Sequence, residues 1–184
     1  SIPFHAEKWE YEKKRLEPFE LDGNWKLSFL SGGPEIPESR SLETLKPWTS
    51  LGDSVLLEFS GIAEYTLKFS MPEVRADRFL LDLGQVHESA RILLNKKEVG
   101  FVWSLPSEID LGGSLQEGEN ILSIQVANLM ANRIIQMDRQ GISWRNFNGI
   151  NFVNIAYEPF DASGWEPETS GLVGPVRLIP VDLH

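Results

Sequence analysis

The chain has 184 residues, of which 41% are hydrophobic and 10% aromatic, enough apolar material for the core of one globular domain. Its 27 acidic and 17 basic residues give a net charge of −10, which would repel nucleic acid phosphates and anionic lipid headgroups, so we expect neither as a partner. The absence of cysteine excludes disulfides, Cys-ligated zinc and a thiol nucleophile, but leaves the cellular compartment undetermined. No segment approaches the ~18 consecutive apolar residues of a membrane span.

The N-terminal segment is densely charged. Between His5 and Leu16, residues of both signs alternate around a few apolar ones, which is typical of a short surface helix or of a linker from a preceding domain. We favour the linker. The expected organisation is therefore a linker or short helix over residues 1–20, followed by one β-sandwich domain over residues 21–184.

Most of the remaining chain predicts short strands. The first two are expected at Trp25 to Leu30 and in the run VLLEF from Val55, with a loop rich in glycine and proline between them. In IAEYTLKF, apolar and polar residues alternate, which indicates a strand with one buried and one wet face. The predicted inward residues are Tyr65, Leu67 and Phe69, and the predicted outward ones are Glu64, Thr66 and Lys68.

The pattern of short strands continues to the end of the chain. Further strands are expected over 79–83, 90–94, 99–103, 107–111, 121–126, 152–157 and 176–183. The stretch Asn95 to Lys97 sits where a tight hairpin turn belongs, although the favoured glycine is missing. With frequent turn residues and no long amphipathic helix after residue 20, the sequence predicts an all-β fold, an antiparallel β-sandwich.

No group of residues in the sequence points to catalysis. The three histidines, His5, His87 and His184, are far apart and match neither HxH nor HExxH spacing, so no metal-binding residue is predicted. GISWR at 141–145 resembles a serine-hydrolase elbow only superficially, because no strand-to-helix context surrounds it. A glycosidase needs two neighbouring carboxylates, which sequence spacing cannot reveal, and we predict no catalytic residue.

The aromatic residues are more informative. Six tryptophans are many for one acidic domain, and an exposed indole that stacks on the C–H face of a sugar is a common way for a β-sandwich to hold a neutral glycan. Trp25 and Trp103 lie at strand ends and are predicted to be in the core. Trp144 and Trp165 lie in loops, where a ligand platform and simple loop packing are both open.

Polar residues beside Trp144 could complete such a platform. Arg145, Asn146 and Asn148 supply a guanidinium and amides that could hydrogen-bond sugar hydroxyls. The pair Asn148-Gly149 is equally typical of a plain turn. Neutral carbohydrate is therefore the predicted ligand class.

Four stretches, taken in order, resemble one known domain. They are FSGIAEYTLKF, LLDLGQVHESARILLNKKEVGFVWSLPSEIDL, LQEGENILSIQVANLMANRI and TSGLVGPVRL, and together they cover about residues 20 to 180. They are similar to the galactose-binding-like, jelly-roll sugar-binding domain of family 2 glycoside hydrolases. They resemble still more the C-terminal domain of the large bacterial α-L-rhamnosidases of family 106.

The resemblance implies particular structural roles. It implies a hairpin at Asn95 to Lys97, a closing strand at Val176 to Leu178, and a core that includes Tyr65, Leu81, Leu83, Trp103, Leu122 and Val126. Two departures stand out. Lys96 replaces the usual hairpin glycine, and Gln136-Met137-Asp138 replaces Ile-Gly-Asp, which argues against a ligand role for that loop.

The stretch VANLMANRI at 126–134 places three polar residues where a strand ends. In the resembling domains such an Asn-Arg pair ties neighbouring loops together, and amides and a guanidinium are suited to satisfy the backbone groups that a strand end leaves unpaired. We favour this interpretation for Asn128, Asn132 and Arg133. The alternative is a site in which they face a sugar or a neighbouring catalytic domain.

The resemblance also implies a function. The family's catalytic carboxylates lie on a barrel domain, and nothing here alternates strands and helices as a barrel does. The implied role is an ancillary, non-catalytic domain of a bacterial glycoside hydrolase, α-L-rhamnosidase-like, whose partners are neutral carbohydrate and the catalytic domain of the same polypeptide. The alternatives are an independent carbohydrate-binding module, a structural interdomain spacer and a small enzyme.

The resemblance bears on cofactors and localisation as well. Many jelly-roll sugar binders carry a structural calcium ion, but no D-x-D-x-D loop indicates one here, and no cofactor is predicted. The resembling proteins are periplasmic or extracellular, which is the localisation that the resemblance implies.

Overall fold

Antiparallel β-sheets dominate the structure, a computed structural model that describes residues 12–71, 73–145 and 158–183. The larger sheet has six strands in the order β4-β3-β5-β11-β8-β9. In that order their bounds are Arg40–Leu42, Trp25–Gly33, Ser60–Ser70, Glu119–Ala127, Ser89–Leu94 and Lys97–Val102. Every neighbouring pair in this sheet is antiparallel.

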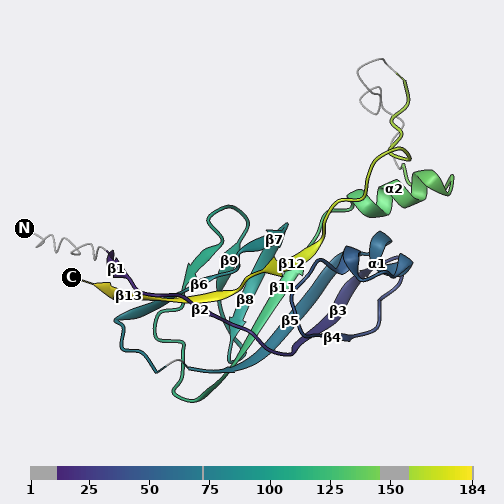
Figure 1. Ribbon diagram of the computed structural model, residues 1–184. Coiled ribbons are helices and arrows are strands. Elements are labelled where there is room, and N and C mark those ends of the chain that lie inside the picture. The colour runs from purple at the N-terminus through teal and green to yellow at the C-terminus, as the bar shows by residue number, and fades with distance from the viewer. Residues whose placement is uncertain (1–11, 72, 146–157, 184) are drawn as a thin grey trace, which may run out of the picture.

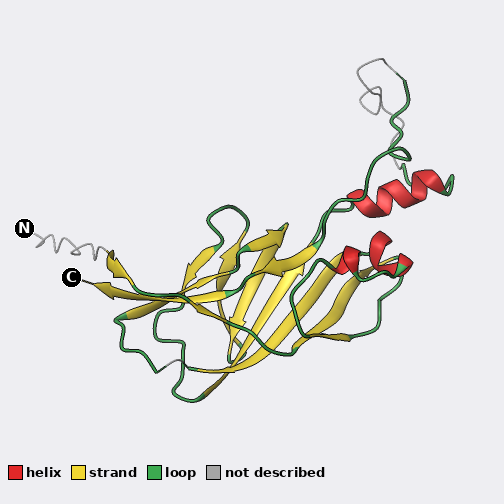
Figure 2. Cartoon of the chain, viewed as in Figure 1, coloured by secondary structure: helices red, strands yellow, loops and turns green. Residues whose placement is uncertain are grey.

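A second sheet packs against the first (Figure 1). It has the order β1-β13-β6-β10, with β2 also paired to β13. The bounds are Glu12–Arg15 (β1), Arg177–Leu183 (β13), Arg78–Asp82 (β6), Glu108–Asp110 (β10) and Phe19–Glu20 (β2). Two short strands, β7 (Gln85–His87) and β12 (Gly171–Gly174), pair separately. The predicted antiparallel β-sandwich is confirmed (Figure 2).

One core fills the space between the sheets. It contains side chains from the six-stranded sheet, such as Tyr65 and Leu122, and from the facing sheet, such as Leu81 and Leu178. The predicted alternation along β5 is confirmed: Tyr65 and Leu67 are buried and Phe69 packs against the core, whereas the intervening polar residues point outward. The core residues predicted from the resemblance are buried except for Trp103. The buried ones are Tyr65, Leu81, Leu83, Leu122 and Val126.

Tyr65 also joins the core to β12. Its ring is fully buried, and its hydroxyl accepts a hydrogen bond from the Leu172 backbone N–H at 3.2 Å. Burial raises the pKa of the Tyr65 phenol, because a phenolate in the core would lose its hydration, and the Leu172 hydrogen bond offsets only part of that effect. The neutral phenol therefore links β5 to the returning end of the chain.

The predicted hairpin and closing strand are confirmed. Asn95 and Lys96 form a two-residue turn between β8 and β9, and both have positive φ, 53° and 68°. Such a turn matches the twist of the flanking strands, which explains why the hairpin forms even with lysine in place of the favoured glycine. The expected closing strand at Val176 to Leu178 corresponds to β13, which begins at Arg177.

The strand predicted from Val55 is wrong. The segment forms a short helix, α1 (Ser54–Glu58). Asp53 precedes it, and its carboxylate accepts a hydrogen bond from the Val55 backbone N–H at 3.0 Å, as an N-cap does. Leu56 and Phe59 are both fully buried. Their inward-pointing side chains are three residues apart, which is the spacing of a helix and not of a strand.

The prediction that Trp103 belongs to the core is also wrong. Its side chain is 75% exposed, whereas Trp25 is buried as predicted. Val102, buried opposite Ala90, takes the inward position at this end of β9, so the next side chain points outward. Trp103 therefore lies on the outer face of the six-stranded sheet.

The charged N-terminal segment contributes a strand. Residues 12–15 form β1 at the edge of the second sheet, paired with β13, where a helix or linker had been expected. Arg15 reaches Glu108 on β10 with two hydrogen bonds, at 2.8 and 3.0 Å, which suits the charged composition of this segment. The strand expected over 152–157 lies outside the described residues.

Candidate functional site

The predicted site residues that the structure describes lie at one end of the sandwich, in and around α2. The chain leaves β11 at Ala127, forms α2 (Ala131–Arg139), and returns to the sheets at β12. Figure 1 shows α2 at the end of the molecule opposite β1 and the end of β13. A short 3₁₀ helix, η1 (Trp48–Ser50), contacts α1 and β12.

Asn128 and Asn132 are committed to internal hydrogen bonds. The Asn128 side chain accepts from the Gly61 backbone N–H at 2.9 Å and donates to the Phe59 carbonyl at 3.0 Å and the Ser170 hydroxyl at 3.1 Å. The Asn132 amide pairs with the backbone N–H and carbonyl of Glu168, both at 2.7 Å. These contacts tie the end of β11 and α2 to the segment that leads into β12.

Arg133 makes the third internal contact. Its guanidinium donates to Glu58 at 2.9 Å, and both side chains are 20% exposed. The ion pair therefore joins α2 to α1. These contacts support the interpretation of Asn128, Asn132 and Arg133 as residues that hold neighbouring segments together.

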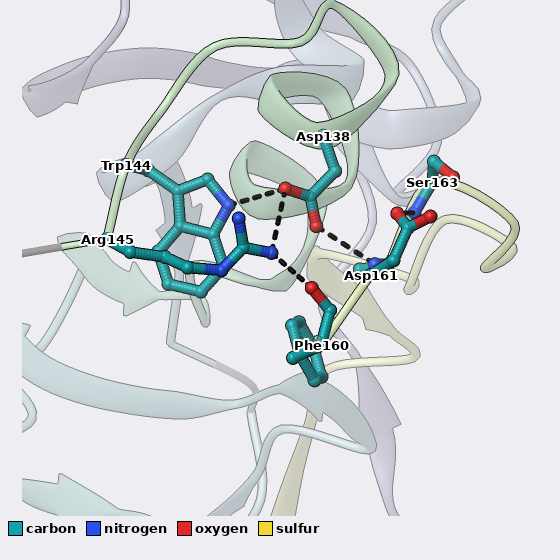
Figure 3. Close-up of polar contacts among 7 residues, drawn as sticks. Asp138, Trp144, Arg145, Phe160, Asp161 and Ser163 are labelled. Atoms are coloured by element: carbon teal, nitrogen blue, oxygen red, sulfur yellow. Dashed lines mark hydrogen bonds and ion pairs between the residues drawn. The ribbon is translucent and has the colours of Figure 1, made fainter. Parts of the chain in front are cut away.

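A second group of residues lies where α2 ends, and we call it the loop cluster: Asp138, Trp144, Arg145, Phe160, Asp161 and Trp165. Figure 3 shows that Asp138 is at its centre. One carboxylate oxygen accepts from the Trp144 indole N–H at 2.7 Å and from Arg145 at 3.4 Å, and the other accepts from the Ala162 backbone N–H at 2.9 Å. Arg145 also donates to the Phe160 carbonyl.

Aromatic rings extend the loop cluster outward. The Arg145 guanidinium lies 4.7 Å from the centre of the Trp144 ring, in cation–π contact, and Trp144 meets Phe160 edge to face at 6.1 Å. Phe160 in turn meets Trp165 edge to face at 5.5 Å. Trp165 is 50% exposed, whereas Trp144 is less exposed and has one face occupied by the guanidinium. Trp165 is therefore the more accessible indole.

A polar cavity of about 460 Å³ opens beside the loop cluster. Its lining includes the Asp138 and Asp161 carboxylates, Ser143, Arg145 and the Phe160 ring. The Arg145 Nε is buried there without a hydrogen-bond partner among the described residues. Hydrogen-bond donors and acceptors beside an aromatic ring are the groups that bind sugar hydroxyls and the C–H face of a sugar.

The carboxylates of the cavity do not resemble a glycosidase pair. The Ser163 backbone N–H donates to Asp161 at 2.8 Å and, with the Ser163 side chain and the charge of Arg145, holds the pKa of the exposed Asp161 carboxyl below its usual range. A glycosidase general acid requires a raised pKa, which is the opposite shift. Asp138 is occupied by hydrogen bonds that hold the loop together.

Two predicted site residues, Asn146 and Asn148, lie outside the described residues. Trp144 contacts Arg145, and Phe160 links Trp144 to Trp165. Asn128, Asn132 and Arg133 make their contacts in a separate network. Sequence reasoning missed Asp138 and Phe160, because the contacts between α2 and residues 160–162 have no periodic signal. Within the described residues no cluster of three or more His, Cys, Asp or Glu is arranged to hold a metal ion, and no helix is long and apolar enough to cross a membrane.

Comparison with known proteins places the chain beside parts of larger enzymes. No protein-family model matches it. It is 30% identical, over 182 residues, to a protein from Formosa agariphila named putative beta-glucuronidase, covering 88% of this chain and 16% of the relative. It thus spans less than a fifth of that relative's length.

Solved structures agree with this picture. A rhamnosidase from Novosphingobium sp. PP1Y superposes with a TM-score of 0.71 and 32% identity, over 95% of this chain and 15% of the enzyme. A Bifidobacterium dentium beta-glucuronidase, complexed with coumarin-3-O-glucuronide, shares the fold with a TM-score of 0.61 and 21% identity, over 93% of this chain and 30% of the enzyme. The chain therefore has a β-sandwich fold that recurs as a minor part of large glycoside hydrolases.

Proposed function

We propose that the chain is an ancillary, non-catalytic domain of a rhamnosidase-like glycoside hydrolase, with a galactose-binding-like jelly-roll fold. One observation carries the proposal: nearly the whole chain matches a small share of a much larger rhamnosidase, at 32% identity. The chain thus matches one part of a larger enzyme, and of the two carboxylates that line the cavity, Asp138 and Asp161, the latter has a pKa shifted in the direction opposite to that of a general acid. The catalytic domain of the same polypeptide is its proposed partner.

The loop cluster is the proposed point of contact with neutral carbohydrate. It includes the end of α2, which lies at the end of the molecule opposite β1 (Figure 1), and it combines the half-exposed Trp165 with a cavity that Arg145 and Asp161 line. A second candidate function is a structural spacer between domains. The observation that favours it is the guanidinium of Arg145 over the Trp144 ring, which leaves less of that ring to stack on a sugar.

Titration of intrinsic tryptophan fluorescence with rhamnose-containing oligosaccharides tests carbohydrate binding. We expect a saturable change with a dissociation constant of about 1 mM, or about −4 kcal/mol, because a single shallow site gains one stacking face and a few hydrogen bonds. Trp165→Ala should remove much of this response, and Trp144→Ala should remove less, since Arg145 covers its ring. If no glycan changes the fluorescence at tens of millimolar (roughly ten times that constant), carbohydrate binding is refuted and the function of the chain is that of a structural spacer between domains.

A further inference from the structure

The outer face of the six-stranded sheet carries a groove that is separate from the loop cluster. The groove has a volume of about 500 Å³ and runs across β5, β11, β8 and β9. Phe101 and Trp103 border it and are 53% and 75% exposed. Two large exposed rings on one sheet face are an apolar surface that the fold itself does not use.

The strand register explains the shape of the groove. Ala127 on β11 lies opposite Ile62 on β5 and Ser89 on β8, and Trp103 follows the pair Ala90–Val102, next to Ser89. The two small side chains, Ala127 and Ser89, thus lie between two large ones, Ile62 and Trp103. A low floor between two raised walls is a slot into which a flat ring fits.

The neighbouring row of the sheet supplies polar groups, and its arginine is paired with a carboxylate. Gln125 lies opposite both Glu64 and Arg91. Its amide nitrogen donates to Glu64 at 3.0 Å, so its carbonyl oxygen can accept from a ligand. The Arg91 Nε donates to Glu98 at 2.6 Å, which neutralises the charge and leaves its terminal nitrogens able to donate.

We infer that this groove binds a neutral pyranoside, with its C–H face on Trp103 and its hydroxyl edge toward Gln125 and Arg91. A pyranose has one apolar face and a rim of hydroxyls, which matches an indole wall, an apolar floor and a polar row. A uronic acid fits less well, because Arg91 is already paired with Glu98 and the chain carries a net charge of −10. This inference rests on the proposed carbohydrate-binding role, but it concerns a site distinct from the loop cluster.

Fluorine NMR of the chain labelled with 5-fluorotryptophan tests the groove directly. The six tryptophans give separate signals, and the signal missing from Trp103→Phe identifies Trp103. With methyl α-L-rhamnopyranoside added up to tens of millimolar (roughly ten times a 1 mM constant), the Trp103 signal should shift and saturate. Glucuronate should produce at least a tenfold weaker effect.

The matched variants separate this site from the loop cluster. In Trp103→Ala, saturable binding at the groove should be lost with an unchanged melting temperature, since the side chain is exposed. Leu105→Ala removes another exposed side chain, 84% exposed and outside the groove, and should bind like the parent chain. If only the Trp165 signal shifted on addition of the rhamnoside, binding at the groove would be refuted while the proposed carbohydrate-binding function would stand. An unmoved Trp103 together with an unmoved Trp165 would overturn both.

Discussion

Replacing Gly171 by alanine should lower the free energy of unfolding by about 3–5 kcal/mol. Gly171 has a φ of +112°, and a Cβ there would lie 2.5 Å from the Tyr65 hydroxyl and 2.8 Å from the Trp48 ring. Both rings are fully buried and cannot move aside, so backbone strain and overpacking add. Because β12 begins at Gly171, the variant would also displace the segment that receives Asn128 and Asn132.

Two other glycines provide matched controls for Gly171→Ala. Gly112 has a φ of +53° but no atom near its Cβ position, so Gly112→Ala should cost only the conformational strain, about 1–2 kcal/mol. Gly113 has open space and no positive φ, so Gly113→Ala should change stability by less than about 0.5 kcal/mol. Urea unfolding followed by tryptophan fluorescence measures all three. Equal losses for Gly171→Ala and Gly112→Ala would show that the close packing against Tyr65 and Trp48 is absent.

Replacing Asn132 by leucine should lower the free energy of unfolding by about 2–3 kcal/mol. Asn132 is 2% exposed, and its amide satisfies both backbone groups of Glu168. Leucine has the same number of side-chain heavy atoms and the same branching as asparagine but no polar atoms, so both hydrogen bonds are lost and the backbone N–H and carbonyl of Glu168 are left without these partners. Equilibrium unfolding in urea gives the change directly.

The neighbouring residue on α2 provides the control for Asn132→Leu. Arg133→Ala removes one partly exposed ion pair and should cost about 0.5–1 kcal/mol. If Asn132 were instead a ligand-binding residue, its replacement would weaken glycan binding and leave stability unchanged. That pattern would refute the role of the strand-end amides in holding α2 to the segment before β12.

The sheets were predictable from the sequence because their signal is local. Alternation along β5 identified its buried face, and the turn at Asn95 and Lys96 identified the hairpin. The run VLLEF was misassigned because a short apolar segment suits a strand and a buried helix equally, and the Asp53 cap decided between them. In each case the outcome followed from neighbours within a few residues.

The candidate sites depend on contacts that no local pattern encodes. The side of the sheet on which Trp103 lies depends on how β9 pairs with β8. The register of that pairing shifts opposite Ile92 and Leu93 of β8, so strict alternation along β9 does not predict which side chains point inward. In the loop cluster, Asp138 accepts a hydrogen bond from the backbone N–H of Ala162, which lies far from Asp138 in the sequence. Hydrophobic periodicity carries no information about such pairs. The prediction that Trp144 and Arg145 bind carbohydrate stays a prediction, although the two side chains do lie in cation–π contact and Arg145 lines the polar cavity.

Turnover of aryl glycosides by the isolated chain is the most direct test of its proposed non-catalytic role. With 4-nitrophenyl α-L-rhamnoside and 4-nitrophenyl β-D-glucuronide as substrates, we expect nitrophenol release at the rate of buffer alone. The reason is that the chain matches only 15% of the length of a rhamnosidase, and that in the cavity of the loop cluster Asp161 has a lowered pKa and Asp138 is engaged by the Trp144 indole and the Ala162 backbone. Release above buffer that Asp138→Asn or Asp161→Asn abolishes would contradict the account and make this chain an enzyme in its own right.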